Sequence, residues 1–145
     1  MPENWVKKQR ELCEKLSSSL LRNYIKSAIL SDGKKPYVRI FFSGDIHFDC
    51  QVKGIKTHFV QNVWLVPKLF FSRDFHYVVY CEKEDHFNII NGIDVPMVSK
   101  EERSTYQKNL VYFVVPMSSF IPIHAWLNKR KKEAERRVQK CLTDF

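Results

Sequence analysis

The stretch that decides the fold is Ile46-His47-Phe48-Asp49-Cys50-Gln51-Val52-Lys53. Apolar and polar side chains alternate along it without a break. Since successive side chains of a strand point to opposite faces of a sheet, the alternation predicts a β-strand with one apolar face. The other face would carry a histidine, a carboxylate, an amide and an amine in a row. One interpretation of that row is an ordinary solvated strand face, and the other is a chemical site.

The segments on either side predict an α+β domain. Apolar residues recur every three or four positions over 4–30 and predict a helix with Asn4 as its N-cap. The turn at 43–45 joins a strand at 37–42 to the strand at 46–55, which makes a hairpin. Further elements are expected as strands at 62–66, 74–81, 86–90 and 110–115, a charged connector at 100–103, and a C-terminal helix over about 123–142. We therefore expect one domain over 1–145, a mixed central sheet between an N-terminal and a C-terminal helix, with the apolar run 75–80 covered by a helix on each face.

The charge of the chain predicts an anionic partner. The sequence has 24 basic and 16 acidic residues, a net charge of +8 and a pI near 9.4. Nucleic acid, DNA rather than RNA, is the first expectation; a soluble basic protein without such a partner is the alternative. The N-terminus has no apolar signal segment, and no run of about 18 apolar residues occurs, so we expect no membrane partner and a cytoplasmic location, or a nuclear one in a eukaryotic host. Cys50 and Cys81 lie in apolar runs and are expected to be reduced core thiols.

The polar row of the strand suits metal-assisted phosphodiester cleavage. That reaction needs oxygen ligands for a divalent ion, and a cation to offset charge in the transition state. Asp49 or Gln51 could supply the oxygen ligand for Mg²⁺ or Mn²⁺, and Lys53 the cation. Because a glutamine is neutral, a nearby carboxylate must supply the affinity for the ion.

Two carboxylates from other segments are candidates for that role. Asp32 precedes the first strand of the hairpin, and pairing about its turn would bring 35–37 opposite 51–53. Glu14, or Glu11, could reach the site from the first helix and orient the water or a second ion.

Gln51-Val52-Lys53-Gly54, followed by Trp64 and by the strands at 75–81 and 87–90, resembles the restriction-endonuclease-like nucleases. The residues at 112–119 are similar to a late strand of small members. This is the PD-(D/E)xK superfamily, in the subset where glutamine replaces the acid of the last motif. The resemblance implies a helix, a mixed sheet and a second helix, with Gln51 binding the metal and Lys53 as the catalytic lysine of an endonuclease. The family places an aspartate at the start or bend of the preceding strand; 37–42 contains none, so Asp49 and Asp32 are the substitutes.

The C-terminal helix is expected to carry a basic surface. Its cations include Lys129, Arg130, Lys131, Lys132, Arg136 and Arg137. They would bind the phosphates of a nucleic-acid backbone. A solvated face with Glu–Lys and Glu–Arg pairs is the alternative. The apolar stripe of this helix is too narrow to favour binding to a membrane surface.

A second function class is also consistent with the sequence. Without an aspartate in the first strand of the hairpin, the same core could be a catalytically inactive interaction protein of phage or mobile-element type. Such a protein would bind a host protein and block or recruit it. Phe70-Phe71, next to Pro67, could be its exposed aromatic patch. A homodimer is a further expected assembly.

Overall fold

A computed structural model gives the structure of the chain. It describes all residues except 1, 22–25, 32, 34, 44–45, 56–62, 83, 104–109 and 144–145. The helices are α1 (Pro2–Leu21), α2 (Val95–Val98) and α3 (Ile123–Thr143), with 3₁₀ turns η1 (Lys68–Phe70), η2 (Gly92–Asp94) and η3 (Met117–Ser119). The strands are β1 (Lys26–Ser31), β2 (Pro36–Ser43), β3 (Ile46–Ile55), β4 (Val63–Pro67), β5 (Phe75–Cys81), β6 (His86–Ile90), β7 (Lys100–Arg103), β8 (Val111–Pro116) and β9 (Ile121–Pro122). The predicted α+β class with a mixed sheet is confirmed.

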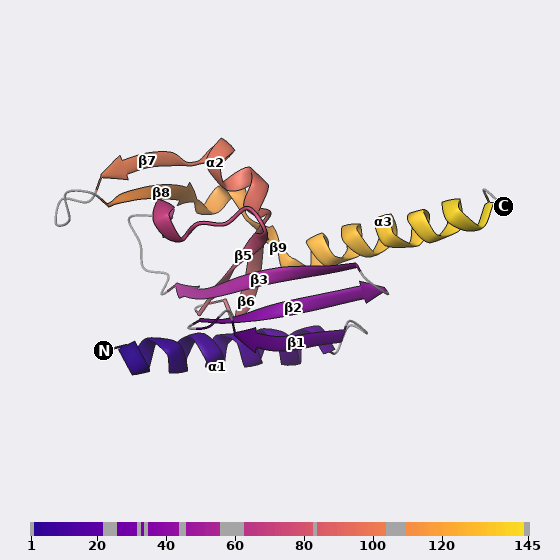
Figure 1. Cartoon of the computed structure of the whole chain (residues 1–145), viewed down its shortest axis with the longest axis horizontal. Helices are drawn as coiled ribbons and strands as arrows, with labels where there is room; N and C mark the ends of the chain where they lie inside the picture. Colours follow the sequence, from indigo (N-terminus) through magenta and orange to yellow (C-terminus); the bar gives the residue numbers. More distant parts are fainter. Residues whose placement is uncertain are drawn as a thin grey trace.

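The strands form two sheets. The larger has the order β1-β2-β3-β5-β6-β9, in which β3 and β5 are parallel and all other neighbours antiparallel. The smaller, with the order β4-β8-β7, is antiparallel. It is built from two excursions of the chain, because β4 lies between β3 and β5 in the sequence and β7–β8 between β6 and β9. Figure 1 shows α1 along one side of the larger sheet and β7 and β8 on the other, with α3 extending away from the body.

Two apolar cores hold these layers together. The first lies between the larger sheet and the helices and includes Leu16 of α1, Val52 of β3 and Trp126 of α3. The second lies between the two sheets, where the Trp64 ring of β4 packs against the Tyr77 ring of β5 with their centres 5.2 Å apart. β5 contributes to both cores, which explains why its sequence is an almost continuous apolar run. The prediction that a helix would cover each face of this run was wrong, because a second sheet covers one of them.

Most of the strands predicted from the sequence are confirmed within one or two residues, including the hairpin of β2 and β3. The helix predicted over 4–30 is confirmed to Leu21 and was wrong at its C-terminal end, where β1 begins at Lys26. α1 ends at Leu21, and Lys26–Ser31 form the edge strand β1, whose Ile29 packs against the helix-side core. The charged connector at 100–103 was also wrong, because these residues form β7 and pair with β8.

Among the described side chains of α3, those of its first turns anchor the helix. Ile123, Trp126 and Leu127 are buried, and the Trp126 indole Nε1 donates a hydrogen bond to Asn91 Oδ1 at 2.9 Å. After Arg130, the described side chains of α3 lie at or near the surface. Within the described chain, no helix combines the length and the apolar composition needed to cross a bilayer. Cys50 and Cys81 are buried and free, as predicted.

Candidate functional site

The polar face of β3 points to the same side of the larger sheet as the smaller sheet. Gln51 and Lys53 both line a cavity of about 370 Å³ there. Its walls come from the N-terminal half of α1, the start of β2, the segment from β4 to η1, β5 and β8. The alternation of β3 explains the placement, because Cys50 and Val52 occupy the opposite face and are fully buried in the helix-side core.

Two lysines of this cavity lie over aromatic rings. Lys53 Nζ is 5.7 Å from the centre of the Trp64 ring, and Lys35 Nζ is 5.1 Å from the centre of the Phe70 ring. Burial lowers the pKa of the Lys53 amine, because the apolar surroundings disfavour its charged form. An anion in the cavity would stabilise the charged form of Lys53, and so compensate for the hydration that the ammonium group loses on burial.

No acidic side chain is among the described residues that line the cavity. Asp49 is the carboxylate nearest in sequence to Gln51, but it is bound by Arg39 on β2. Arg39 Nε donates to Asp49 Oδ1 at 2.8 Å, and Nη2 donates to Oδ2 at 3.2 Å. The two residues are direct cross-strand partners, so the hairpin register itself creates the pair. Both oxygens of Asp49 therefore bond to a guanidinium group outside the cavity.

The other predicted metal ligands do not join Gln51 in the described structure. Glu14 lies on the exposed side of α1, with its Oε1 3.4 Å from Arg10 Nε, and it does not line the cavity. Asp32 lies outside the described residues. Continued by one residue, the register of β2 and β3 brings Tyr37 opposite Gln51, at the start of the strand where the resemblance implies an acid.

Among the described residues, no group of three or more His, Cys, Asp or Glu side chains is placed to hold a metal ion. The Mg²⁺ or Mn²⁺ site therefore stays a prediction.

The basic residues of α3 differ in their surroundings. Lys129, Lys131, Lys132 and Arg136 are exposed. The Arg130 guanidinium instead packs over the rings of Phe48 and Trp126, with its centre 5.4 and 5.5 Å from them, and its Nη1 lies 3.2 Å from Glu133. Arg130 thus closes the helix-side core. The side chain of Arg137 lies outside the described residues.

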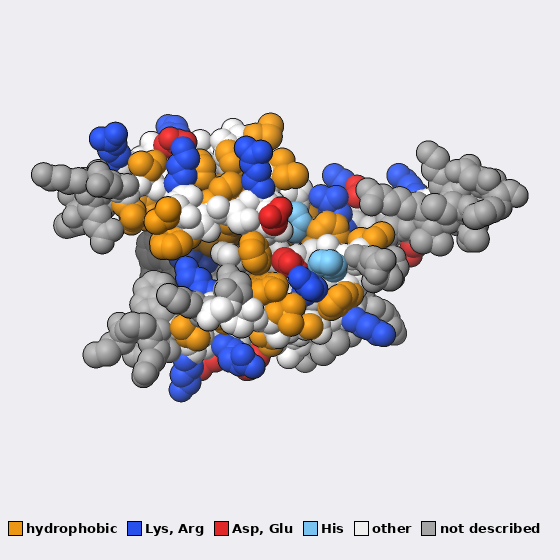
Figure 2. Space-filling model, in the orientation of Figure 1, with side chains coloured by type: hydrophobic (Ala, Val, Ile, Leu, Met, Phe, Trp, Pro, Cys, Tyr) orange, Lys and Arg blue, Asp and Glu red, His pale blue; other side chains and the backbone are white. Residues whose placement is uncertain are grey.

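The predicted aromatic patch at Phe70-Phe71 is divided by the fold. Phe70 is 59% exposed, whereas Phe71 stacks on Tyr77 and packs edge-on against Phe113. Leu69, beside Phe70, is 77% exposed but does not line the cavity. On the face shown in Figure 2, Lys and Arg side chains are scattered among the hydrophobic ones, and acidic side chains are fewer.

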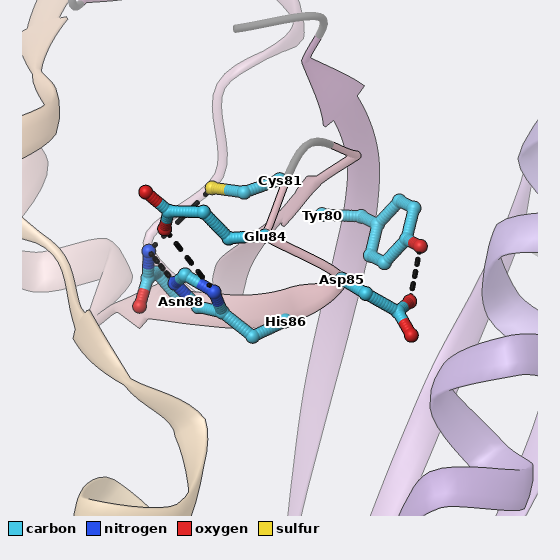
Figure 3. A network of polar contacts seen from close by, with 6 residues as sticks. All are labelled: Tyr80, Cys81, Glu84, Asp85, His86 and Asn88. Carbon is cyan, nitrogen blue, oxygen red and sulfur yellow. Dashed lines mark hydrogen bonds and ion pairs between the residues drawn. The ribbon is translucent and has the colours of Figure 1, made fainter.

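A second group of polar side chains lies on the hairpin of β5 and β6 (Figure 3). The Asn88 amide donates toward Cys81 Sγ and lies 3.2 Å from His86 Nε2, and His86 Nδ1 is 3.3 Å from Glu84. Burial raises the pKa of the Cys81 thiol, so this thiol is a poor nucleophile despite the nearby imidazole. These contacts link side chains of the two strands and stabilise the hairpin.

Lys35, Trp64 and Phe70 are among the cavity residues that the sequence did not indicate as part of the site. The hairpin register carried a signal for Lys35, because pairing 35–37 with 51–53 puts it near Lys53. Trp64 and Phe70 reach the cavity only because β4 leaves for the second sheet, and no local pattern indicates that excursion.

Comparison with protein-family models, with curated proteins and with solved structures found no match for this chain.

Proposed function

We propose that the protein binds nucleic acid, with a phosphate group in the cavity beside Lys53 and Lys35. The observation that carries this proposal is the pairing of two cations with aromatic rings, in a cavity whose described lining has no acidic side chain. Phosphate groups neutralise lysines, and nucleobases stack on aromatic side chains. A nucleic acid therefore matches both the lysines and the aromatic rings that line the cavity. The net charge of +8 supports the same partner.

The exposed cations of α3 form a second basic surface, on a helix that runs away from the cavity end of β3 (Figure 1). Lys129, Lys131, Lys132 and Arg136 lie on a helix that projects from the body (Figure 1). Twenty-one residues of helix span about 30 Å, which is enough to follow several phosphates of a backbone. The helix then contributes affinity without sequence preference, because phosphate contacts carry no direct sequence information.

Binding is tested by fluorescence anisotropy with labelled single-stranded and duplex DNA over a series of salt concentrations. We expect log K to fall linearly with log salt concentration, as it does when lysines displace counterions from phosphates. A variant in which Lys131 and Lys132 are alanine should have a shallower slope, and Lys100→Ala on the distant strand β7 is the matched control. Absence of salt-dependent binding to any nucleic acid would contradict the proposal.

Metal-dependent phosphodiester hydrolysis is a second candidate, and two observations favour it. The order of helix, mixed sheet and helix fits the nuclease resemblance. Gln51 and Lys53 of β3 both line the cavity. A carboxylate would have to join them: Asp32, or Asp49 after release from Arg39. Plasmid nicking with Mg²⁺ and Mn²⁺ tests this candidate. Hydrolysis by this site requires that Lys53→Ala abolish cleavage while leaving DNA binding nearly intact, whereas phosphate binding by Lys53 requires that the same change weaken binding.

Tyr37→Asp tests the metal geometry directly. It places a carboxylate opposite Gln51, where the resemblance implies one. We expect this variant to gain Mn²⁺ binding, measured by isothermal titration calorimetry, relative to a Tyr37→Asn control. A wild-type protein that binds Mn²⁺ as tightly as the variant would show that a carboxylate already reaches the cavity.

A further inference from the structure

We propose that the cavity takes one nucleotide of a single strand, with its phosphate beside Lys53 and Lys35 and its base on the ring of Phe70. This inference rests on the proposed nucleic-acid binding and specifies its substrate class. It goes beyond the basic surface of α3, which would bind the phosphates of single strands and duplexes alike.

The first support is the shape of the site. A volume of about 370 Å³ is at the lower end of the range of roughly 300–1,000 Å³ that holds small ligands. A paired base lies inside its duplex and cannot enter such a cavity unless it leaves the stack. An unpaired base has both faces free and needs no such step.

The second support is the exposure of Phe70. Most of its side chain, 59%, is open to solvent, although it lines the cavity. Exposed aromatic rings at the edge of a basic groove are the platforms on which single strands stack. Lys35 Nζ lies over this ring, so a base that displaces the amine from the ring would still have a cation within reach of its phosphate.

The third support is the amide of Gln51. This side chain faces the cavity and makes no hydrogen bond with another described residue. Gln9, by contrast, uses its amide nitrogen to donate to the carbonyl of Val52. The amide of Gln51 therefore has a donor and an acceptor available to bind the edge of a base. Contacts to phosphate do not recognise a base edge in this way.

A single strand is favoured over a free nucleotide by charge. The cations of the cavity can contact the phosphate of one nucleotide, whereas the exposed lysines of α3 require further phosphates on the same molecule. A strand long enough to reach from the cavity to α3 should bind more tightly than its separate nucleotides, because the second contact becomes intramolecular.

The experiment compares two adjacent residues of the same segment. Phe70→Ala removes the ring in the cavity, and Leu69→Ala removes an exposed side chain that does not line it. Each variant is titrated by anisotropy into a labelled oligothymidylate and into a duplex, with thymidine monophosphate as a competitor. Circular dichroism verifies that both variants are folded, which their exposure leads us to expect.

We expect Phe70→Ala to weaken oligothymidylate binding by roughly 5- to 150-fold, the range for loss of one stacked base, and to leave duplex binding unchanged. Leu69→Ala should bind the oligonucleotide within about twofold of the wild type. Equal affinity for single strand and duplex, together with an unaffected Phe70→Ala variant, would overturn this inference while leaving nucleic-acid binding in place. Competition by the mononucleotide as strong as by the oligonucleotide would overturn the assignment to a strand. Loss of all binding in the wild type would end both proposals.

Discussion

Substituting Lys53 by methionine should change binding and stability in opposite directions. Methionine keeps an unbranched side chain of similar length in the cavity but removes the charge. The wild-type amine is half-buried over Trp64, and burial lowers its pKa. Its charged form is therefore disfavoured by folding, and removing the charge relieves that cost.

The size of the effect on stability follows from the contacts that are exchanged. The substitution loses a cation–π contact of about 1 kcal/mol and gains a sulfur–aromatic contact of roughly 0.3–1.5 kcal/mol with the same ring. These two contributions nearly cancel. The sign of the change in the free energy of unfolding is therefore decided by relief of the desolvation cost of the buried ammonium group. We expect the free energy of unfolding at pH 7 to equal or exceed that of the wild type.

The expected pH dependence has a definite sign. The pKa of Lys53 is lower in the folded protein than in the unfolded chain. At pH values between these two pKa values, the unfolded chain binds more protons than the folded protein. Wild-type stability should therefore rise with pH through that window, which lies below 10.5. The advantage of Lys53→Met over the wild type should shrink over the same window.

The effect on binding is set by the number of phosphates that the protein neutralises. Lys35 and Lys53 in the cavity, with the four exposed cations of α3, give six contacts if each meets one phosphate. Six contacts correspond to a salt slope of about −4 for a single strand, and loss of one lowers its magnitude by about 0.7. The affinity at low salt should fall roughly 10-fold, as expected for one charge-assisted contact.

Urea unfolding and anisotropy on the same samples test both halves of this prediction. A Lys53→Met variant that unfolds at lower urea concentration, but binds with an unchanged salt slope, would refute the reasoning. Such a result would mean that the amine stabilises the fold and contacts no phosphate. Lys100→Met is the control, because Lys100 is exposed on the edge strand β7.

Three further predictions concern the surroundings of the site. Asp49→Asn and Arg39→Gln should lower the melting temperature equally, and the double variant should melt no lower than either single variant. If Asp49→Asn instead leaves the melting temperature unchanged but abolishes stabilisation by Mg²⁺, Asp49 is a metal ligand. Gly92→Ala should cost about 3 kcal/mol in urea unfolding, because its Cβ would lie 2.0 Å from the carbonyl oxygen of Phe75. Burial and the nearby Arg130 charge lower the pKa of His76 to about 4, so stability should fall as the pH drops from about 6.5 toward 4, and His76→Asn should flatten this dependence in urea midpoints measured across that range.

The hairpin shows how far the sequence predicts the structure. Strict alternation predicts β3, and the turn before it fixes the register with β2. From that register alone, Arg39 falls opposite Asp49 on one face, so the ion pair that holds this carboxylate could have been predicted. Cross-strand partners on a shared face are local information, and the charges of both residues are visible in the sequence.

Two of the missed strands, β1 and β7, depend on partners that no local pattern reveals. β1 continues the apolar spacing of the helix before it and becomes a strand because it pairs with β2. β7 consists of exposed charged residues and exists through pairing with β8, supported by the ion pair of Lys68 with Glu101 at 2.9 Å. Intrinsic propensity is weak at such edges, and tertiary pairing overrides it.

The charges of the residues lining the cavity bear on whether a metal ion or a phosphate group would bind there. The strand positions that the nuclease resemblance assigns to a metal site carry an amide at Gln51 and an amine at Lys53. A divalent ion placed there would meet cations, since Asp49 is neutralised by Arg39 and Tyr37 stands opposite Gln51. A phosphate placed there would instead neutralise Lys53, whose burial makes its charge costly without an anion. These residues therefore support the proposed direct binding of phosphate over binding through a metal ion.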